Sequence, residues 1–217
     1  MTRNYFDQEL QELEVLLLKM SSMVEETLGN AIKALKNQDV SMAQQVIDND
    51  DVIDDMEFTV EDKCLKLIAL QQPLAKDLRL IATALKIITD LERIADYAVD
   101  ISKITIKLAG EVYIKELIDI PRMAEITAKM VKGSIDSYVN QDVEKAREVS
   151  KMDDEVDGLY KQIFRELLFI MMEDPRKINQ ATNFLLISRY LERIGDHVTN
   201  VCERIIYSIT GEREDLN

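Results

Sequence analysis

Hydrophobic residues recur at alternating gaps of three and four along most of the chain, the spacing of one face of a long helix. In residues 5–37 this apolar stripe comprises Phe6, Leu10, Leu13, Leu17, Met20, Val24, Leu28, Ala31 and Leu35. The same spacing predicts further helices over about 41–70 and 76–108. Pro73 separates these two because proline cannot continue a helix, and Gly110 is a good terminator for the third.

Three more helices follow in the second half of the chain. Pro121 suits the start of a helix that reaches Val139. The fifth helix holds apolar positions over 146–167 and ends before Pro175, and the sixth ends near Gly211. The chain of 217 residues has only six Gly and three Pro, which argues against a loop-rich or all-β fold. The pattern therefore predicts an all-α protein.

The two halves are copies of each other. The segment Asn37–Val40 recurs as Asn140–Val143 at an offset of 103, with the same four residues. Leu-Glu-Arg-Ile-Ala-Asp at 91–96 recurs as Leu-Glu-Arg-Ile-Gly-Asp at 191–196, at an offset of 100. The repeat predicts two tandem up-down three-helix bundles, residues 1–112 and 113–217. Helices of about 30 residues are about 45 Å long, so the molecule should be elongated.

Acidic residues recur in this repeat, although a duplicated core segment needs to keep only its apolar residues. At 100° per residue, Glu92 and Asp100 lie about 40° to either side of Asp96, away from the apolar stripe. The sixth helix places Glu192, Asp196 and Asn200 at the same angles. The second and fifth helices also carry acids four residues apart, beside their apolar stripes. The candidate metal ligands are Asp50, Asp54, Glu92, Asp96 and Asp100 in the first copy, and Asp153, Asp157, Glu192, Asp196 and Asn200 in the second.

Like charges four residues apart destabilise a helix, so each acidic pair favours a compensating cation. Arg93 and Arg193 follow the acids in sequence but lie about 100° round the helix, so we expect them not to face the acids squarely. A metal ion bridging carboxylates of two adjacent helices would compensate instead. Oxygen ligands suit iron, manganese, magnesium or calcium, with zinc also an option. The alternative is a solvated acidic stripe with mobile counterions.

Charge and composition exclude several classes of function. The net charge of −14 makes nucleic acid and anionic membranes poor partners. No run of about 18 apolar residues and no signal segment is visible, which predicts a cytoplasmic protein without membrane insertion. Cys64 and Cys202 lie far apart in helical patterns and are expected to be core residues.

His197 is the only histidine, so the chain cannot supply the two Glu-x-x-His motifs of a ferritin-like di-iron site. Its direction, about 100° from that of Asp196, favours a surface or hydrogen-bonding role. No nucleophile–base pair and no glycine-rich phosphate loop is visible, so the sequence does not indicate an enzyme.

The third helix has a second apolar face that needs a cover. This face, opposite its main stripe, comprises Leu78, Ile81, Leu85 and Ile88. A loop, the other bundle or a second subunit could supply the cover.

Several segments of the chain resemble the PhoU family of phosphate-uptake regulators. The resemblance runs from about residue 5 to residue 210. It rests on three segments, 72–100, 171–176 and 191–203. The first includes Lys-Asp-Leu-Arg and Asp-Leu-Glu-Arg-Ile, and the second reads Met-Met-Glu-Asp-Pro-Arg. An acid followed four residues later by Asp resembles the metal motif of the family, and Asn200 departs from it.

The resemblance implies a non-enzymatic negative regulator of phosphate uptake. The implied partners are the ATPase subunit of the phosphate-specific ABC transporter and the phosphate-sensing histidine kinase, with homodimers frequent. The implied cofactor is a multinuclear iron or zinc cluster on the acidic motifs. A carboxylate-bridged metalloenzyme, such as a phosphatase or oxidase, and a helical scaffold without a metal function are the alternatives.

Overall fold

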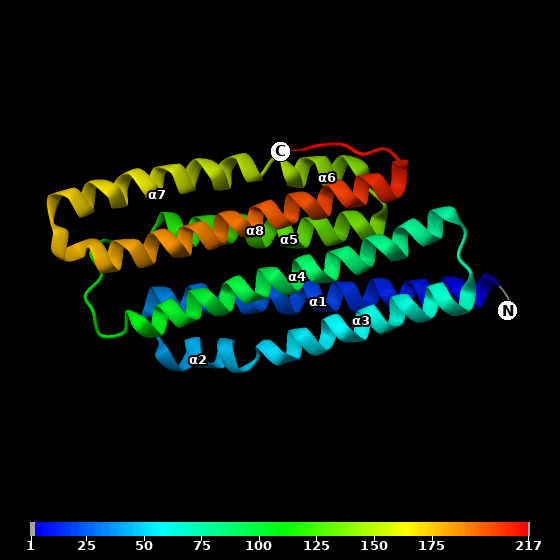
Figure 1. The fold of residues 1–217 in the computed structure, drawn as a ribbon, viewed down its shortest axis with the longest axis horizontal. Coiled ribbons are helices and arrows are strands. Elements are labelled where there is room, and N and C mark those ends of the chain that lie inside the picture. The colour runs from blue at the N-terminus through cyan, green and yellow to red at the C-terminus, as the bar shows by residue number, and fades with distance from the viewer. Residues whose placement is uncertain (1–2, 217) are drawn as a thin grey trace.

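The computed structural model describes residues 3–216, which fold into two helical bundles lying side by side (Figure 1). The outermost residues of the two expected domains, 1–2 and 217, lie outside the described residues. The first bundle consists of α1 (Arg3–Asn37), α2 (Val40–Asp48), α3 (Asp50–Gln71) and α4 (Ala75–Lys107). The second consists of α5 (Asp119–Asn140), α6 (Val143–Ser150), α7 (Asp153–Glu173), the 3₁₀ turn η1 (Pro175–Lys177) and α8 (Ile178–Thr210). The all-α, two-bundle prediction is confirmed, and the molecule is elongated.

The second and fifth predicted helices are not continuous. The second breaks at Asn49, whose backbone φ of −93° and ψ of 1° are not helical, and the fifth breaks at residues 151–152. As a result, Asp50 and Asp153 lie in the first turns of α3 and α7. The partial positive charge of a helix N-terminus favours a carboxylate there.

The predicted apolar stripes form the core of both bundles. Leu17, Val24 and Ile94 are fully buried, as is Phe184 in the second bundle. Cys64 and Cys202 are fully buried, and burial raises the pKa of each thiol to about 12. Their prediction as core residues is confirmed. No helix within residues 3–216 has both the length and the apolar character needed to cross a membrane.

The second apolar face of α4 is covered by the other bundle. Helix α4 packs against α8, and α1 packs against α5. Ile81 and Ile88 are buried within the chain, whereas Leu78 at the end of the face stays exposed. A buried hydrogen bond of 3.0 Å from the Tyr138 hydroxyl to the Leu80 carbonyl also joins the two bundles. The other bundle is therefore the cover among the three options that the sequence left open.

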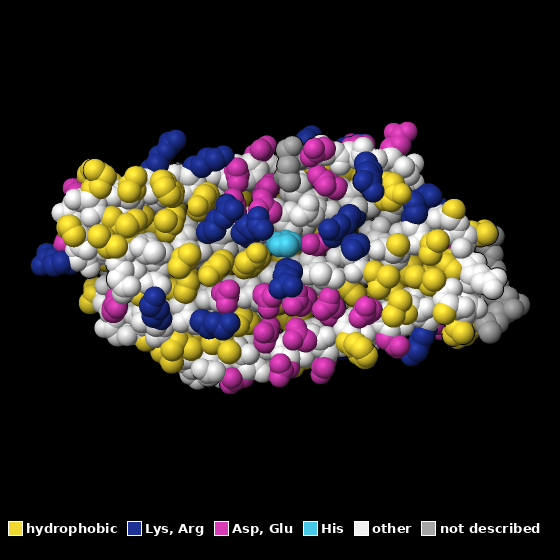
Figure 2. Space-filling view, viewed as in Figure 1, with side chains coloured by type: hydrophobic (Ala, Val, Ile, Leu, Met, Phe, Trp, Pro, Cys, Tyr) yellow, Lys and Arg dark blue, Asp and Glu magenta, His cyan; other side chains and the backbone are white. Residues whose placement is uncertain are grey.

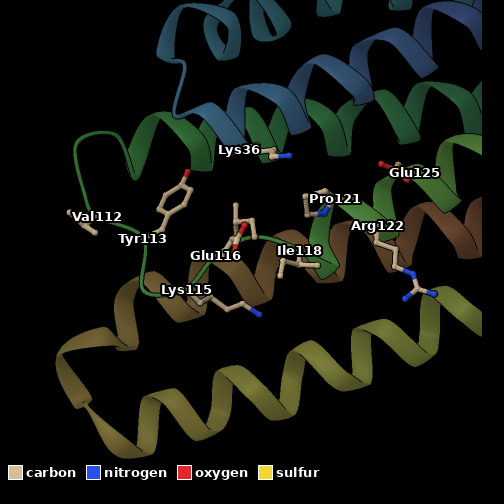
Figure 3. Close-up of a pocket in the computed structure, with 10 residues that line it drawn as sticks. Lys36, Val112, Tyr113, Lys115, Glu116, Ile118, Pro121, Arg122 and Glu125 are labelled. Carbon is tan, nitrogen blue, oxygen red and sulfur yellow. The ribbon is translucent and has the colours of Figure 1, made fainter.

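The segment between α4 and α5 forms hydrogen bonds to both bundles. The Tyr113 hydroxyl donates to the Leu35 carbonyl of the first bundle (2.7 Å), and the Ile114 N–H donates to Gln180 Oε1 of the second (2.5 Å). A hollow of about 670 Å³ lies beside this segment, with Lys36 and Arg122 among its lining residues (Figure 3). These contacts hold the linker against both bundles.

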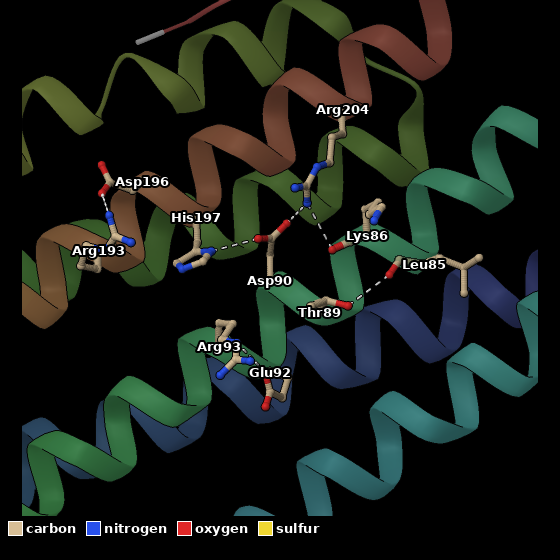
Figure 4. Close-up of polar contacts among 10 residues, drawn as sticks. All are labelled: Leu85, Lys86, Thr89, Asp90, Glu92, Arg93, Arg193, Asp196, His197 and Arg204. Carbon is tan, nitrogen blue, oxygen red and sulfur yellow. Dashed lines mark hydrogen bonds and ion pairs between the residues drawn. The ribbon is translucent and has the colours of Figure 1, made fainter.

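A polar bridge crosses the interface between α4 and α8 (Figure 4). The side chain of Asp90 is only 8% exposed, and its two oxygens contact His197 Nδ1 at 2.9 Å and the Arg204 guanidinium. Tyr97 and Tyr190 stack beside it, with ring centroids 5.6 Å apart. The hydrogen-bonding role expected for His197 is confirmed, with a partner in the other bundle.

Replacing Asp90 by Ala should lower the free energy of unfolding by about 1–2 kcal/mol, because Arg204 and His197 lose their shared acceptor. Urea denaturation measures the effect. Asp55→Ala, at an exposed acid of α3, is the control and should change little. An unchanged midpoint for Asp90→Ala would show that the bridge does not stabilise the two-bundle arrangement.

Candidate functional site

Acidic side chains of α3 and α4 face each other along one edge of the first bundle. We define the first acidic cluster as Asp50, Asp54, Glu57, Glu92 and Asp96. Burial raises the pKa of Glu92 to about 7, and the negative charges of Asp96, Glu57 and Asp54 add to the shift. Burial, Asp54 and Asp96 also raise the pKa of Asp50. The acids of the two helices are thus close enough to affect each other's ionisation.

The second bundle repeats this arrangement between α7 and α8. We define the second acidic cluster as Asp153, Asp157, Glu192 and Asp196. Burial raises the pKa of Asp153 to about 7, with contributions from Asp196, Asp157 and Glu192. Asp153 Oδ1 and Glu192 Oε2 are buried and accept no hydrogen bond from any described residue. A buried acceptor without a partner is costly, so these two atoms are suited to a cation.

A glycine explains why Asp153 is the more deeply placed acid. A Cβ atom at Gly195 would overlap with Asp153 Oδ1, so the side chain of Asp153 occupies space that only glycine leaves free. The equivalent residue in the first bundle is Ala95. This role of Gly195 was not predicted from the sequence. The exchange of Ala95 for Gly195 between otherwise matching hexapeptides was the signal that could have found it.

Arginines pair with the acids, contrary to the sequence expectation. Arg93 Nη1 lies 3.0 Å from Asp96 Oδ2. Arg193 Nη1 lies 3.1 Å from Asp196 Oδ2 (Figure 4). Each of these arginines lies three residues from its acid, which is only about 60° round the helix, and side chains at this spacing are neighbours. Arg189 also pairs with Glu192. These pairs engage the outer edges of the clusters and leave the buried oxygens of the second cluster without a partner.

Two predicted ligands lie at the end of the clusters. Asp100 pairs with Lys103 at 3.0 Å, and its charge helps to raise the pKa of Tyr190, for which burial is the main cause. Lys103 also lies near Asp50 and opposes the rise of its pKa. Asn200, the equivalent of Asp100, is half-buried one turn beyond Asp196. The second copy therefore has one carboxylate fewer at this position.

The structure brings eight of the ten predicted ligands into two clusters, but it does not test whether they bind metal. Within residues 3–216, no three Asp, Glu, His or Cys side chains are grouped closely enough to hold an ion in their present positions. The donor set of carboxylate oxygens, with two buried and unpaired, fits a hard or borderline metal ion.

Comparison with known proteins identifies the family. The model of the PhoU domain matches residues 17–105 and 120–205, one match in each bundle. A "Phosphate-specific transport system accessory protein PhoU homolog" from Clostridium acetobutylicum is 51% identical over the full length of both chains. The chain belongs to the PhoU family. A homologue of the same description from Aquifex aeolicus is 42% identical over 94% of this chain and 92% of its own.

Solved PhoU structures have the same fold. The crystal structure of PhoU from Pseudomonas aeruginosa superimposes with a TM-score of 0.90 at 38% identity, covering 95% of this chain and all of that chain. The structure of the phosphate transport system regulatory protein PhoU from Streptococcus pneumoniae also gives a TM-score of 0.90, at 31% identity, covering 97% of this chain and all of that one. The resemblance inferred from sequence segments is therefore confirmed for the PhoU family and its fold.

The pH dependence of stability tests the environment of Glu92. Its pKa is raised from 4.5 to about 7, so the folded protein keeps a proton that the unfolded chain releases. For metal-free protein, the free energy of unfolding should therefore fall as pH rises from 4.5 to about 7. Glu92→Gln should raise stability at pH 7 by about 1 kcal/mol after allowance for solvent screening, and by nothing below pH 4.5.

Urea denaturation at a series of pH values, with a chelator present, measures this effect. Glu26→Gln, at an exposed carboxyl of α1 outside both clusters, is the control and should follow the wild type. Equal stability of Glu92→Gln and wild type across the range would contradict the raised pKa.

Gly195→Ala tests the space that Asp153 occupies. The new Cβ should push the Asp153 carboxyl toward solvent, which lowers its pKa, and alanine should stabilise the helix by about 1 kcal/mol. The pKa of Asp153 is measured by NMR titration and stability by urea denaturation. Gly158→Ala, where a Cβ meets open space, isolates the effect of helix propensity. A pKa for Asp153 that is the same in both variants would refute the packing argument.

Proposed function

We propose that the chain is a non-enzymatic accessory regulator of phosphate uptake. Its similarity over its full length to a protein described as a phosphate-specific transport system accessory protein carries this proposal. Coverage of the whole chain matters, because both bundles and the linker between them have counterparts in that relative. The absence of a nucleophile–base pair in the sequence supports a regulatory role.

The proposed action is negative regulation. The regulator contacts the ATPase subunit of the phosphate-specific ABC transporter and the phosphate-sensing histidine kinase, and inhibits both when phosphate is plentiful. These partners place it at the cytoplasmic side of the membrane. A homodimer belongs to the same proposal. Since Ile81 and Ile88 are already buried within the chain, a dimer would use another surface.

The two acidic clusters are the proposed metal sites. Asp50, Asp54, Glu92 and Asp96 would hold ions in the first bundle, with Asp100 at its end. The corresponding set in the second bundle is Asp153, Asp157, Glu192, Asp196 and Asn200. A multinuclear iron cluster is proposed, and carboxylate oxygens also accept zinc, manganese, magnesium or calcium. A bound cation would neutralise the repulsion within each cluster and take up the buried oxygens of Asp153 and Glu192.

Paired variants in the two bundles test the metal sites. Asp50→Asn with Glu92→Gln should weaken binding at the first cluster alone by roughly ten-fold or more, since each removes a charged ligand. Asp153→Asn with Glu192→Gln should do the same at the second. Equilibrium dialysis against Mn²⁺ or Zn²⁺, followed by elemental analysis, gives the affinity and the number of ions. Unchanged metal binding in both double variants would remove the clusters as sites.

Gene deletion tests the regulatory function. In a strain without this gene, phosphate-responsive genes should stay expressed in phosphate-rich medium, and the wild-type gene should restore their repression. A pull-down with the transporter's ATPase subunit and with the cytoplasmic region of the kinase identifies the direct contact. Normal repression and normal phosphate uptake in the deletion strain would contradict the proposed function.

A further inference from the structure

Both acidic clusters lie on one face of the molecule, with basic side chains between them (Figure 2). In the first cluster, Arg93 is the arginine that contacts the acids of α4. Its Nε lies 3.5 Å from Glu92 Oε2, its Nη1 lies 3.0 Å from Asp96 Oδ2, and its side chain is 57% exposed. Both partners are proposed metal ligands. A cation that binds these two carboxylates therefore has to displace Arg93.

A further arginine contacts the corresponding glutamate in the second bundle. Arg189 pairs with Glu192 Oε1, and its Cζ lies 5.8 Å from the ring centroid of Tyr160. A guanidinium over an aromatic ring is held there by a cation–π interaction. The first bundle has Thr89 in place of Arg189 and Glu57 in place of Tyr160, so the first cluster has no equivalent of this arrangement. Tyr160 therefore helps to hold Arg189 in place when Glu192 binds an ion.

The other oxygen of Glu192 is buried and has no partner. Glu192 is only 8% exposed, and its Oε2 forms no hydrogen bond with any described residue. Asp153 Oδ1 is a second buried oxygen of this kind, and it occupies the space beside Gly195, one turn along α8 from Glu192. Within residues 3–216, no oxygen of the first cluster is both buried and unpaired. The second cluster thus presents two oxygens that lost their hydration on folding and that an ion can bind without breaking an ion pair.

Net charge favours the opposite order of binding. The first cluster has five carboxylates and pairs with one arginine, whereas the second has four and pairs with Arg189, Arg193 and Lys161. Exposed acids of the first cluster, such as Asp54, are hydrated, and physiological salt screens their charge over about 8 Å. These charges act on an ion through water, whereas the two free oxygens of the second cluster contact it directly. Preorganised ligands therefore outweigh the larger number of charges.

We propose that the second acidic cluster binds the first divalent cation, through Asp153 Oδ1 and Glu192 Oε2, and that a later ion binds the first cluster by displacing Arg93. This inference rests on the proposed metal sites and adds the order in which they fill. Arg93 loses both of its partners only when the first cluster fills. The exposed charge of α4 therefore changes at the higher ion concentration, and not when the first ion binds.

The first ion keeps part of its water shell. Within residues 3–216, no three acids are grouped closely enough to surround an ion in their present positions, so water completes the coordination of an ion bound by two carboxylates. One or two carboxylates with several waters are typical of Mg²⁺, and Mn²⁺ accepts the same oxygen ligands. Mn²⁺ is therefore a suitable probe, because its binding is measured directly by electron paramagnetic resonance.

Titration of chelator-treated, full-length protein with Mn²⁺ tests the order, and the resonance signal of free Mn²⁺ measures binding. The wild type should show a tight and a weak phase. Asp153→Asn with Glu192→Gln should abolish the tight phase, whereas Asp50→Asn with Glu92→Gln should abolish only the weak one. The opposite assignment, or one phase to which both clusters contribute equally, would overturn the inference and leave the metal sites in place. No binding, or binding that neither double variant changes, would overturn both.

Arg93→Gln tests the displacement. It should tighten the weak phase by roughly five-fold, because it removes one positive charge from the site that the ion enters. Arg189→Gln is the matched variant and should not tighten the tight phase, because Arg189 stays beside the bound ion and orients Glu192. An unchanged weak phase in Arg93→Gln, or equal tightening in both variants, would overturn the proposed displacement.

Gly195→Ala tests the preorganisation of the second cluster. The new Cβ should push Asp153 Oδ1 away and weaken the tight phase by roughly ten-fold, a typical cost of disturbing the orientation of a ligand. Gly158→Ala, where a Cβ meets open space, should leave both phases unchanged. Circular dichroism checks that every variant folds. A tight phase of equal affinity in the two variants would overturn the role given to the buried oxygen of Asp153.

Discussion

The apolar contacts of α4 with α3 and of α8 with α7 hold acidic side chains closer together than their charges favour. Ile94 and its counterpart Ile194 are fully buried, so the neighbouring Glu92 and Glu192 have little freedom to move away from the acids opposite them. The result is a raised pKa in both bundles, caused first by burial and then by the neighbouring carboxylates. Core packing therefore offsets the repulsion between these like charges. A bound cation would relieve part of that repulsion and so raise the free energy of unfolding.

The two copies are related but not equivalent. Gly195 leaves space for the Asp153 carboxyl where the first copy has Ala95, and Asn200 replaces the negative charge of Asp100. The second cluster therefore has fewer charges but deeper oxygens. A site of this kind should be more selective and less accessible than the first, because its ligands are more confined. Gene duplication has thus left one fold with two chemically distinct acidic surfaces.

Periodicity and the internal repeat were enough to predict the helices, their stripes and the two-bundle architecture, because each depends on local spacing. The face carrying Glu92 and Asp96 was also predictable, since a helix fixes the angles between its residues. Three features were not predictable from the sequence. They are the break at Asn49, the contact of Asp90 with His197 and Arg204, and the space beside Gly195. Each depends on tertiary neighbours that a single helix does not reveal. Arg93 was placed wrongly because its offset of about 100° holds for Glu92, whereas Asp96, three residues further on, lies only about 60° away.

Packing keeps protons on Glu92 and Asp153, and a bound cation would displace these protons. The direct test is to titrate metal-free protein with Zn²⁺ or Mn²⁺ in weakly buffered solution at about pH 6.5 and to record the protons released. With Glu92 and Asp153 each having a pKa of about 7, binding should release about one to two protons per chain. Metal binding without proton release, or no binding at all, would contradict the account.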